Sequence, residues 1–196
     1  LTPLRIRYKA QSDIGNAQDP PLLAQIRESG CIMILVGLES LSEDTLKTVD
    51  AFKAKMCGGY EAGVRRIQEH GIAVLGAFIV GFDDDTPETF DRIAAFCRRT
   101  NVFPQVTIAT PLPRTGMTER LRAEGRLPEE AYWDRCTYYD AIHEPRGMTA
   151  ETVEAGVAAL HERLYTREAS RARRAYLREI LRGLRAEARM PAEAVV

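Results

Sequence analysis

The run Ile32-Met33-Ile34-Leu35-Val36 decides the fold class of this chain. It is short, rich in β-branched residues and bounded by Gly30 and Gly37, which is typical of a buried strand in a parallel sheet. A second apolar run at residues 72–80 follows a segment with helical periodicity at residues 60–70. The two runs predict parallel strands joined by a helical crossover.

The same alternation continues outward in both directions. Apolar stretches, caps and Pro or Gly stop signals predict outer strands at residues 4–10 and 106–109, and further helices at residues 22–29, 42–49 and 86–99. Residues 51–59 contain two adjacent glycines and are expected to form an irregular connection. The resulting order β-α-β-α-β-α-β indicates an α/β fold with a parallel sheet. The chain contains neither G-x-G-x-x-G nor G-x-x-x-x-G-K-[ST], so it gives no motif support for a dinucleotide or P-loop fold.

Beyond Pro113 the pattern becomes helical and rich in arginine. Helices are predicted at residues 118–123, 149–164 and 167–189, after a boundary near residues 114–116. The arginines of the last helix indicate either a solvated helical face or an anion-binding or RNA-binding face. We favour the solvated face, because few aromatic residues lie among the arginines and the rest of the chain is not basic.

The composition is that of a globular protein. Among 196 residues, 45% are apolar and 28% are charged, and 27 basic side chains nearly balance 28 acidic ones. This balance gives no reason to expect nucleic acid or an anionic membrane as a partner. No apolar run approaches the roughly 18 residues of a membrane span, and no signal peptide is recognisable. We therefore expect a cytoplasmic protein. Because the sequence begins without Met and close to a predicted strand, we also expect a fragment.

The four cysteines are far apart in the sequence, at Cys31, Cys57, Cys97 and Cys136. They form no C-x-x-C pair and no three-cysteine cluster, so no local zinc or iron–sulfur site is predicted. A chain with this capacity to form a core does not need a disulfide framework. We expect reduced and mostly buried thiols.

Functional groups in a parallel α/β sheet gather beyond the carboxyl ends of the strands. Here the glycines Gly37 and Gly81 leave room for a ligand against the backbone, and Glu39 places a charge directly after an apolar strand. This arrangement suits a ligand with amino and hydroxyl groups. Alternatively, the glycines only turn the chain and Glu39 caps a helix. The acidic residues 83–85 are interpreted as a capped, solvated loop and not as a cation site.

A family resemblance is carried by motifs that occur in a fixed order along most of the chain: Gly30-Cys31 with Ile34, VGLES at residues 36–40, Leu46, GIAVLGAFIVG at residues 71–81, TPET at residues 86–89 and TPLP at residues 110–113. In this order they resemble the later half of a radical S-adenosylmethionine (SAM) barrel. The chain is most similar to the cobalamin-binding-domain type, which contains the hopanoid methylases. Residues from 126 onward resemble the helical tail of those proteins.

The resemblance implies a partial TIM-like (β/α) barrel over residues 1–114 and a helical C-terminal extension over residues 115–196. It implies SAM as cofactor, cleaved reductively to a 5′-deoxyadenosyl radical with a [4Fe–4S] cluster, and cobalamin in the parent protein. The cluster motif C-x-x-x-C-x-x-C is absent from this sequence. On this interpretation the chain acts only when it is joined to a cluster-binding half that precedes it.

The resemblance also implies a set of SAM-binding residues at the strand ends: Gln11, Glu39, Ser40, Lys53, Ile79, Gly81 and Thr110. Gln11 and Glu39, with Ser40 beside it, match contacts to the ribose or amino group. Lys53 falls near the residue that pairs with the SAM carboxylate.

The remaining matches concern the adenine. Ile79 and Gly81 match the segment that packs against the ring, and Thr110 closes the adenine side. This sequence departs from the family pattern at Arg114, where relatives often have Gly. The turn there is expected to differ, because Arg reaches positive φ less easily.

Two other functions remain open. A non-catalytic interaction domain would use the truncated barrel as a scaffold. A hydrolase or lyase half is disfavoured, because no strand end carries a His, Lys or Cys suited to acid, base or nucleophilic chemistry. The substrate is expected to be a small or lipid-like molecule. We also expect self-association, because the strand at residues 4–10 would form an uncovered edge.

Overall fold

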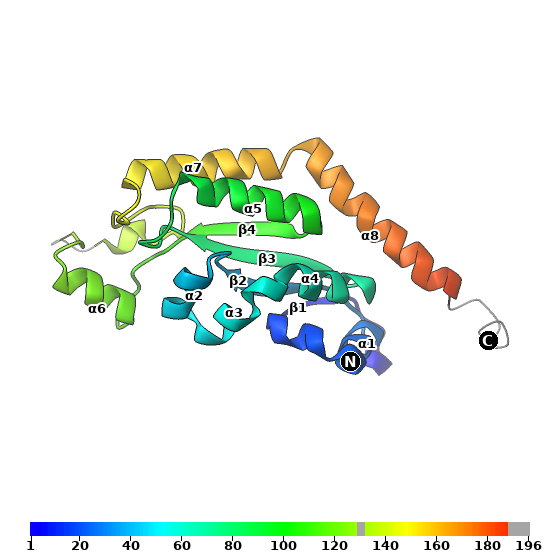
Figure 1. The fold of residues 1–196 in the computed structure, drawn as a ribbon. Helices are drawn as coiled ribbons and strands as arrows, with labels where there is room; N and C mark the ends of the chain where they lie inside the picture. Colours follow the sequence, from blue (N-terminus) through cyan, green and yellow to red (C-terminus); the bar gives the residue numbers. More distant parts are fainter. Residues whose placement is uncertain (129–131, 188–196) are drawn as a thin grey trace.

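The computed structural model describes residues 1–128 and 132–187, and it confirms an α/β fold with a parallel sheet (Figure 1). The four strands are β1 (Tyr8–Ser12), β2 (Cys31–Glu39), β3 (Ala73–Val80) and β4 (Phe103–Ile108). They lie side by side in the order β1-β2-β3-β4, and every neighbouring pair is parallel. Such neighbours require crossover connections, which the helices between the strands supply.

The helices follow the predicted alternation and then form the C-terminal part. They are α1 (Pro20–Glu28), α2 (Glu43–Val49), α3 (Ala51–Met56), α4 (Tyr60–Glu69), α5 (Pro87–Thr100), α6 (Gly116–Ala123), α7 (Ala150–Leu164) and α8 (Arg167–Glu187). Short 3₁₀ turns occupy Thr2–Leu4, Ile14–Gln18, Cys57–Gly59 and Trp133–Arg135. None of the helices within the described ranges combines the length and apolar character that a membrane span needs.

Several local predictions were wrong. The first strand begins at Tyr8, because Pro3 starts a 3₁₀ turn and Arg5 then takes a left-handed φ of 50°. The irregular connection at residues 51–59 contains α3, whose first N–H groups donate to the Asp50 carboxylate, from Phe52 at 3.1 Å and from Lys53 at 3.2 Å. Asp50 thus favours the start of a helix, and α3 forms before the two glycines at residues 58–59 are reached.

The fourth strand also begins earlier than predicted, at Phe103, and includes Pro104. Proline lacks an N–H to donate, but β4 is an edge of the described sheet, where a missing donor is tolerated. After β4, Arg114 does adopt the left-handed conformation, with φ 60°. Arg114 thus reaches a positive φ in this turn without glycine.

One face of the sheet holds the core and the other stays half-buried. Alternate strand residues are fully buried against the helices, among them Val36, Leu38, Phe78, Val80 and Ile108. Their neighbours on the opposite face are only half-buried. The period of two in a strand places the two sets on opposite faces. Only one face of the described sheet is therefore covered by the helices of the core.

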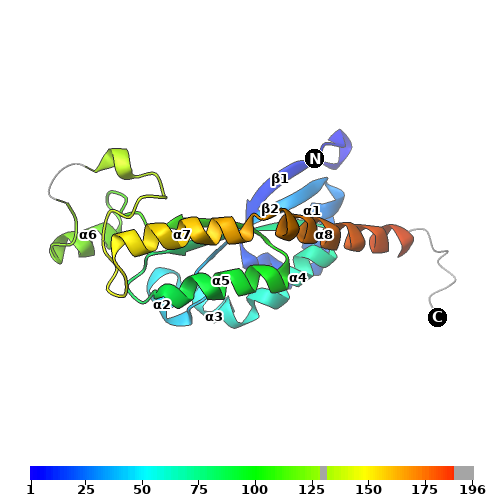
Figure 2. The same cartoon turned by 90° about the horizontal axis from the view of Figure 1, so that it is seen from above.

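The C-terminal helices extend along the covered side. Helix α7 lies beside α5, and α8 continues from the end of α7 past the amino ends of the strands, where it contacts α4 (Figures 1 and 2). The strands point toward α2 and α6, whereas the junction of α7 and α8 lies at the opposite end of the sheet (Figure 1). The carboxyl ends of the strands and the start of α8 therefore form two separate regions of the molecule.

Candidate functional site

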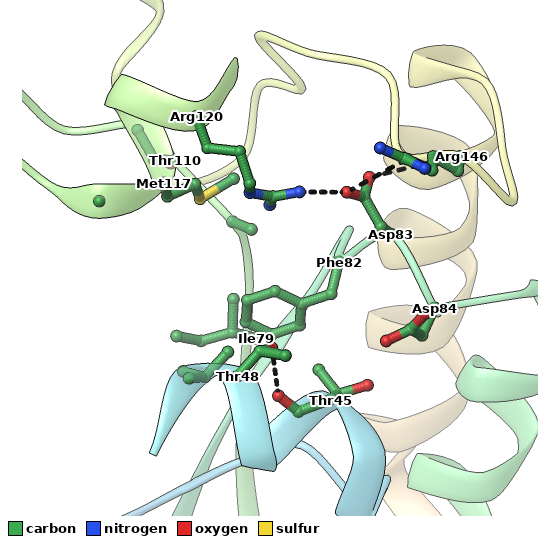
Figure 3. Close-up of a pocket in the computed structure, with 13 residues that line it drawn as sticks. Thr45, Thr48, Ile79, Phe82, Asp83, Asp84, Thr110, Met117, Arg120 and Arg146 are labelled. Atoms are coloured by element: carbon green, nitrogen blue, oxygen red, sulfur yellow. Dashed lines mark hydrogen bonds and ion pairs between the residues drawn. The ribbon is translucent and has the colours of Figure 1, made fainter. Parts of the chain in front are cut away.

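A cavity of about 790 Å³ lies at the carboxyl ends of β3 and β4 (Figure 3). Its walls come from α2, the loops after β3 and β4, and α6, with Ile79, Phe82, Thr110 and Met117 among the lining residues. Two of the predicted site residues, Ile79 and Thr110, thus share one cavity. The cavity lies where the topology of a parallel sheet predicts a ligand site.

The α2 wall adds an unpartnered polar atom. Thr45 and Thr48 both line the cavity. The Thr48 hydroxyl donates to the Thr45 carbonyl at 2.8 Å, but the Thr45 Oγ1 is buried and has no hydrogen-bond partner among the described residues. A buried hydroxyl without a partner costs free energy, which marks Thr45 as an unusual position in this wall.

Glu39 and Lys53 form an ion pair at the end of β2. The Lys53 Nζ lies 2.8 Å from Glu39 Oε1 and 3.7 Å from the Asp50 carboxylate, and the two paired side chains are 12% and 22% exposed. A Cβ at Gly37 would come within 2.3 Å of Glu39 Oε1. The room that Gly37 leaves is therefore filled by this pair, which brings two predicted residues together in direct contact.

Glu39 is not the cap of the following helix. The N-cap of α2 is Ser42, whose hydroxyl accepts the Thr45 N–H at 3.3 Å. Ser40, a predicted site residue, is buried, and its Oγ accepts the Ser42 N–H at 3.1 Å. The Ser40 hydroxyl therefore already supports the turn between β2 and α2.

Gln11 lies apart from Glu39. The register pairs Gln11 with Leu35, and Leu35 with Leu75, on the half-buried face of the sheet. Glu39 comes four residues after Leu35, roughly 13 Å further along the strand direction. Gln11 thus shares the open sheet face but not the height of the Glu39–Lys53 pair.

Gly81 anchors the loop after β3 through its backbone. At a φ of 96°, its N–H donates to Asp85 Oδ2 at 2.8 Å, and the Phe82 N–H donates to the same oxygen at 3.0 Å. The Gly81 carbonyl accepts a hydrogen bond from the Nε2–H of His143 at 3.2 Å. Burial lowers the pKa of His143 and favours its neutral form.

The prediction of a solvated acidic loop was wrong. Asp85 is 1% exposed, and burial raises the pKa of its carboxyl group. Asp83 is 16% exposed and binds arginines from the C-terminal part, with Arg126 Nη2 and Arg120 Nη1 each 2.5 Å from one of its oxygens. The Arg126 guanidinium, followed by that of Arg120, holds the pKa of Asp83 well below its usual range.

A third arginine completes this group. The backbone N–H of Arg146 donates to Asp83 Oδ1 at 3.2 Å, and both Arg120 and Arg146 line the cavity (Figure 3). Sequence reasoning missed Arg120, Arg126, Arg146 and His143. The signals available were an acidic run at a strand end and an excess of arginine in the tail. Neither signal says which arginine meets which aspartate.

No protein-family model matches the chain. It is similar to bacteriochlorophyllide d C-12(1)-methyltransferase of Chlorobaculum tepidum, at 29% identity over 84% of this chain and 36% of the relative. It is similar to hopanoid C-2 methylase of Rhodopseudomonas palustris, at 33% identity over 64% of this chain and 24% of the relative. A third relative is bacteriochlorophyllide d C-8(2)-methyltransferase of Chlorobaculum tepidum, at 27% identity over 70% of this chain and 30% of the relative.

The chain spans about a quarter to a third of the length of these curated relatives. The similar proteins agree in the reaction that their names describe, because all three transfer a methyl group to carbon. The homologues of this chain are thus methyltransferases of the bacteriochlorophyllide and hopanoid C-methylase type.

Proposed function

We propose that this chain is the SAM-binding half of a radical SAM methylase. The single observation that carries the proposal is the cavity at the carboxyl ends of the strands, which joins Ile79 and Thr110 with the unpartnered Thr45 hydroxyl. The methyltransferase relatives support a methylase. In this proposal residues 1–114 form the barrel half and residues 115–196 the helical extension. Because Met117 and Arg120 line the cavity, the extension takes part in the site.

The residues present fit SAM. A cavity of about 790 Å³ has room for a nucleoside. Ile79 and Phe82 offer an apolar surface to the adenine, and Thr110 closes its side. The Glu39–Lys53 pair, which lies at the end of β2 outside the lining of that cavity, offers one carboxylate and one ammonium group, the complements of the ammonium and carboxylate of an amino acid. When bound, SAM supplies the methyl group or the adenosyl fragment for radical chemistry.

The other proposed residues have supporting tasks. Gly81 holds the loop of the adenine side in its left-handed turn, and Ser40 supports the turn that follows Glu39. Gln11 is exposed on the half-buried face of the sheet and lies closer to the amino ends of the strands than Glu39 does. It would contact only a ligand that extends in that direction.

A [4Fe–4S] cluster does not fit the described residues. Within residues 1–128 and 132–187, no three His, Cys, Asp or Glu side chains gather as metal ligands. Cys31 and Cys97 are buried in β2 and α5, on separate elements. We therefore assign the cluster, and with it radical generation, to a cluster-binding segment that works together with this chain. From the resemblance we also propose that the whole enzyme uses cobalamin.

Isothermal titration calorimetry of the 196-residue chain with SAM tests the proposal. We expect saturable binding and a roughly tenfold weaker affinity for Lys53→Met, because a charge-assisted pair is lost. Lys47→Met is the matched control. Lys47 is 57% exposed and, among the residues that the structure describes, pairs with Glu43 and Asp44 on its own helix alone, so its removal should leave the affinity unchanged.

Two results would contradict the proposed function or its site. A chain that binds no SAM supports the non-catalytic scaffold. Equal effects of Lys53→Met and Lys47→Met would contradict the assignment of Lys53 to the SAM carboxylate.

A further inference from the structure

A second cavity, of about 330 Å³, lies where the end of α5 meets the junction of α7 and α8. It shares no lining residue with the cavity at the strand ends. Figure 1 shows this junction at the other end of the sheet from α6. Any ligand here would therefore be independent of the proposed SAM site.

Arg173 places a buried positive charge in the wall of this cavity. The residue lines the cavity and is only 4% exposed, although it belongs to the arginine-rich helix α8. Its Nη2 donates to the Leu164 carbonyl at 2.6 Å, and the guanidinium lies 5.5 Å from the Tyr165 ring centroid and 5.8 Å from that of Phe103. These contacts orient the side chain, but they contain no anion.

The guanidinium of Arg173 thus lacks a counter-charge in the described part of the chain. It forms no ion pair there, and its Nε is buried without a hydrogen-bond partner. Burial lowers the pKa of Arg173, yet arginine stays protonated in proteins. A buried cation without an anion is expensive, so this position is unfavourable unless a ligand compensates it.

The surroundings of Arg173 also favour an anion. Arg98 and Arg163 line the same cavity, whose lining contains one carboxylate, that of Glu168. Arg163 also pairs with Asp91, which does not line the cavity, at 2.9 Å. Burial raises the pKa of the neighbouring Cys97 thiol to about 12, so that group supplies no negative charge at neutral pH. The net charge of the lining is therefore positive.

The backbone around the cavity also favours an anion. The cavity lies at the first turn of α8, a helix of 21 residues. The N-terminal end of a long helix carries a partial positive charge and N–H groups without intrahelical partners. The Thr166 Oγ1 accepts only one of them, from Ala169 at 3.1 Å.

We propose that this cavity binds a small phosphate-type oxyanion, with Arg173 as its buried counter-charge. Inorganic phosphate and the phosphate group of a small monoester share the chemistry that the cavity would recognise. Both present a compact, multiply charged oxyanion to guanidinium and backbone N–H donors.

Thermal unfolding of the 196-residue chain at constant ionic strength tests the proposal, with chloride replaced stepwise by phosphate. We expect a saturable rise of Tm with phosphate, since a ligand that binds only the folded state stabilises it. Arg173→Met should abolish the rise. In chloride alone this variant should be at least as stable as the parent chain, because replacing an unpaired buried charge by an apolar side chain removes its desolvation cost.

Arg174→Met is the matched control. It removes one positive charge from the adjacent, exposed position of the same helix, so the phosphate-dependent rise should persist. Replacing inorganic phosphate by glycerol phosphate distinguishes a site for the free ion from a site that also accepts a phosphate monoester. A rise with the ester identifies a monoester as an acceptable ligand, and a rise with inorganic phosphate alone restricts the site to the free ion.

Two results would overturn the proposal. An equal rise in the parent chain and in Arg173→Met would be a general salt effect. A loss of stability in Arg173→Met that is the same in chloride and in phosphate would mean that Arg173 only stabilises the end of α7. If Arg173→Met does not fold, ³¹P NMR titration of Arg98→Met decides, with at least a severalfold weaker phosphate affinity expected and an unchanged affinity contradicting the site.

Discussion

Glu39 combines backbone strain with a charge at the end of β2. Its φ of 60° lies in the left-handed region, which costs a non-glycine residue roughly 1–2 kcal/mol. The register with β3 shifts between Gly37 and Glu39, so the strand is irregular at this point. The Lys53 ammonium, 2.8 Å from Glu39 Oε1, helps to offset the cost of this conformation. Strain that is held by tertiary contacts is typical of functional positions.

Asp83 allows a test of how strongly the C-terminal part is tied to the sheet. Asp83→Asn should lower the free energy of unfolding by about 2 kcal/mol at neutral pH, because the charge-assisted bonds to Arg126 and Arg120 are lost. The folded-state pKa of Asp83 lies below the unfolded one. Its stabilisation is therefore complete above pH about 4 and is lost as the pH falls further. Urea denaturation between neutral pH and pH 3 measures both effects.

The neighbouring Asp84→Asn serves as control for this prediction. Asp84 is exposed and forms no ion pair among the described residues, so the change should stay within about 0.5 kcal/mol. Equal losses in the two variants would contradict the role assigned to Asp83.

His143 should make stability depend on pH in a different range. Because burial lowers its pKa in the folded state, the unfolded chain binds a proton first as the pH falls below about 6.5. The free energy of unfolding should thus decrease from pH 7.5 to pH 5.5, and this decrease should become smaller in His143→Gln. Burial also lowers the pKa of His161, which is less buried, so His161→Gln is the comparison. An unchanged pH profile in His143→Gln would show that other groups dominate.

At the scale of elements, the contact between α5 and α7 depends on a glycine. A Cβ at Gly156 in α7 would lie 2.3 Å from two atoms of the Phe90 ring in α5. Gly156 therefore permits the close approach of the two helices, through which α7 is attached to the covered side of the α/β part.

Gly156→Ala should destabilise the protein by roughly 1–3 kcal/mol, although alanine is the better helix former. Gly183 in α8 has no atom within 4 Å of an added Cβ. There, Gly183→Ala should stabilise by up to about 1 kcal/mol through helix propensity alone. Chemical denaturation of both variants gives the comparison, and stabilisation by Gly156→Ala would contradict the packing of α7 on α5.

At the scale of the whole molecule, the sheet has one covered face and, at β1, an edge with no neighbouring strand within the described residues. The other edge, β4, is partly covered, because the Ile108 N–H donates to the Tyr138 carbonyl at 2.7 Å and the Tyr165 hydroxyl donates to the Pro104 carbonyl. On the half-buried face, Leu35, Leu75 and Phe103 lie in one row across the strands. An apolar, half-exposed sheet face with an open edge at β1 favours association with another chain.

We therefore expect the chain to self-associate. Light scattering coupled to size-exclusion chromatography should show a mass that rises with concentration, and Leu75→Lys should reduce this rise by placing a charge in the row. Phe52→Lys, on α3, replaces a side chain that is 54% exposed and should not reduce it. A strict monomer at high concentration would contradict the prediction.

The sequence by itself determined most of the elements and the end of the sheet at which the candidate site lies. The run at residues 32–36, the run at residues 72–80 and their glycine boundaries carry local hydrophobic patterns, which act within a few residues and can be read without a fold. Parallel order then places Ile79 and Thr110 at one edge, and the structure has both in one cavity.

Only the tertiary structure decided which charges meet. Arg126 and Arg146 follow Asp83 by 43 and 63 residues, and Arg173 reaches the Phe103 ring from another helix. No local pattern encodes such pairs, because they result from the way in which the helical part packs against the α/β part. The same packing buried Asp85, His143 and Arg173, whose sequence neighbours are typical of solvated segments. Burial, and with it the energetic cost of each polar group, is a property of the assembled fold.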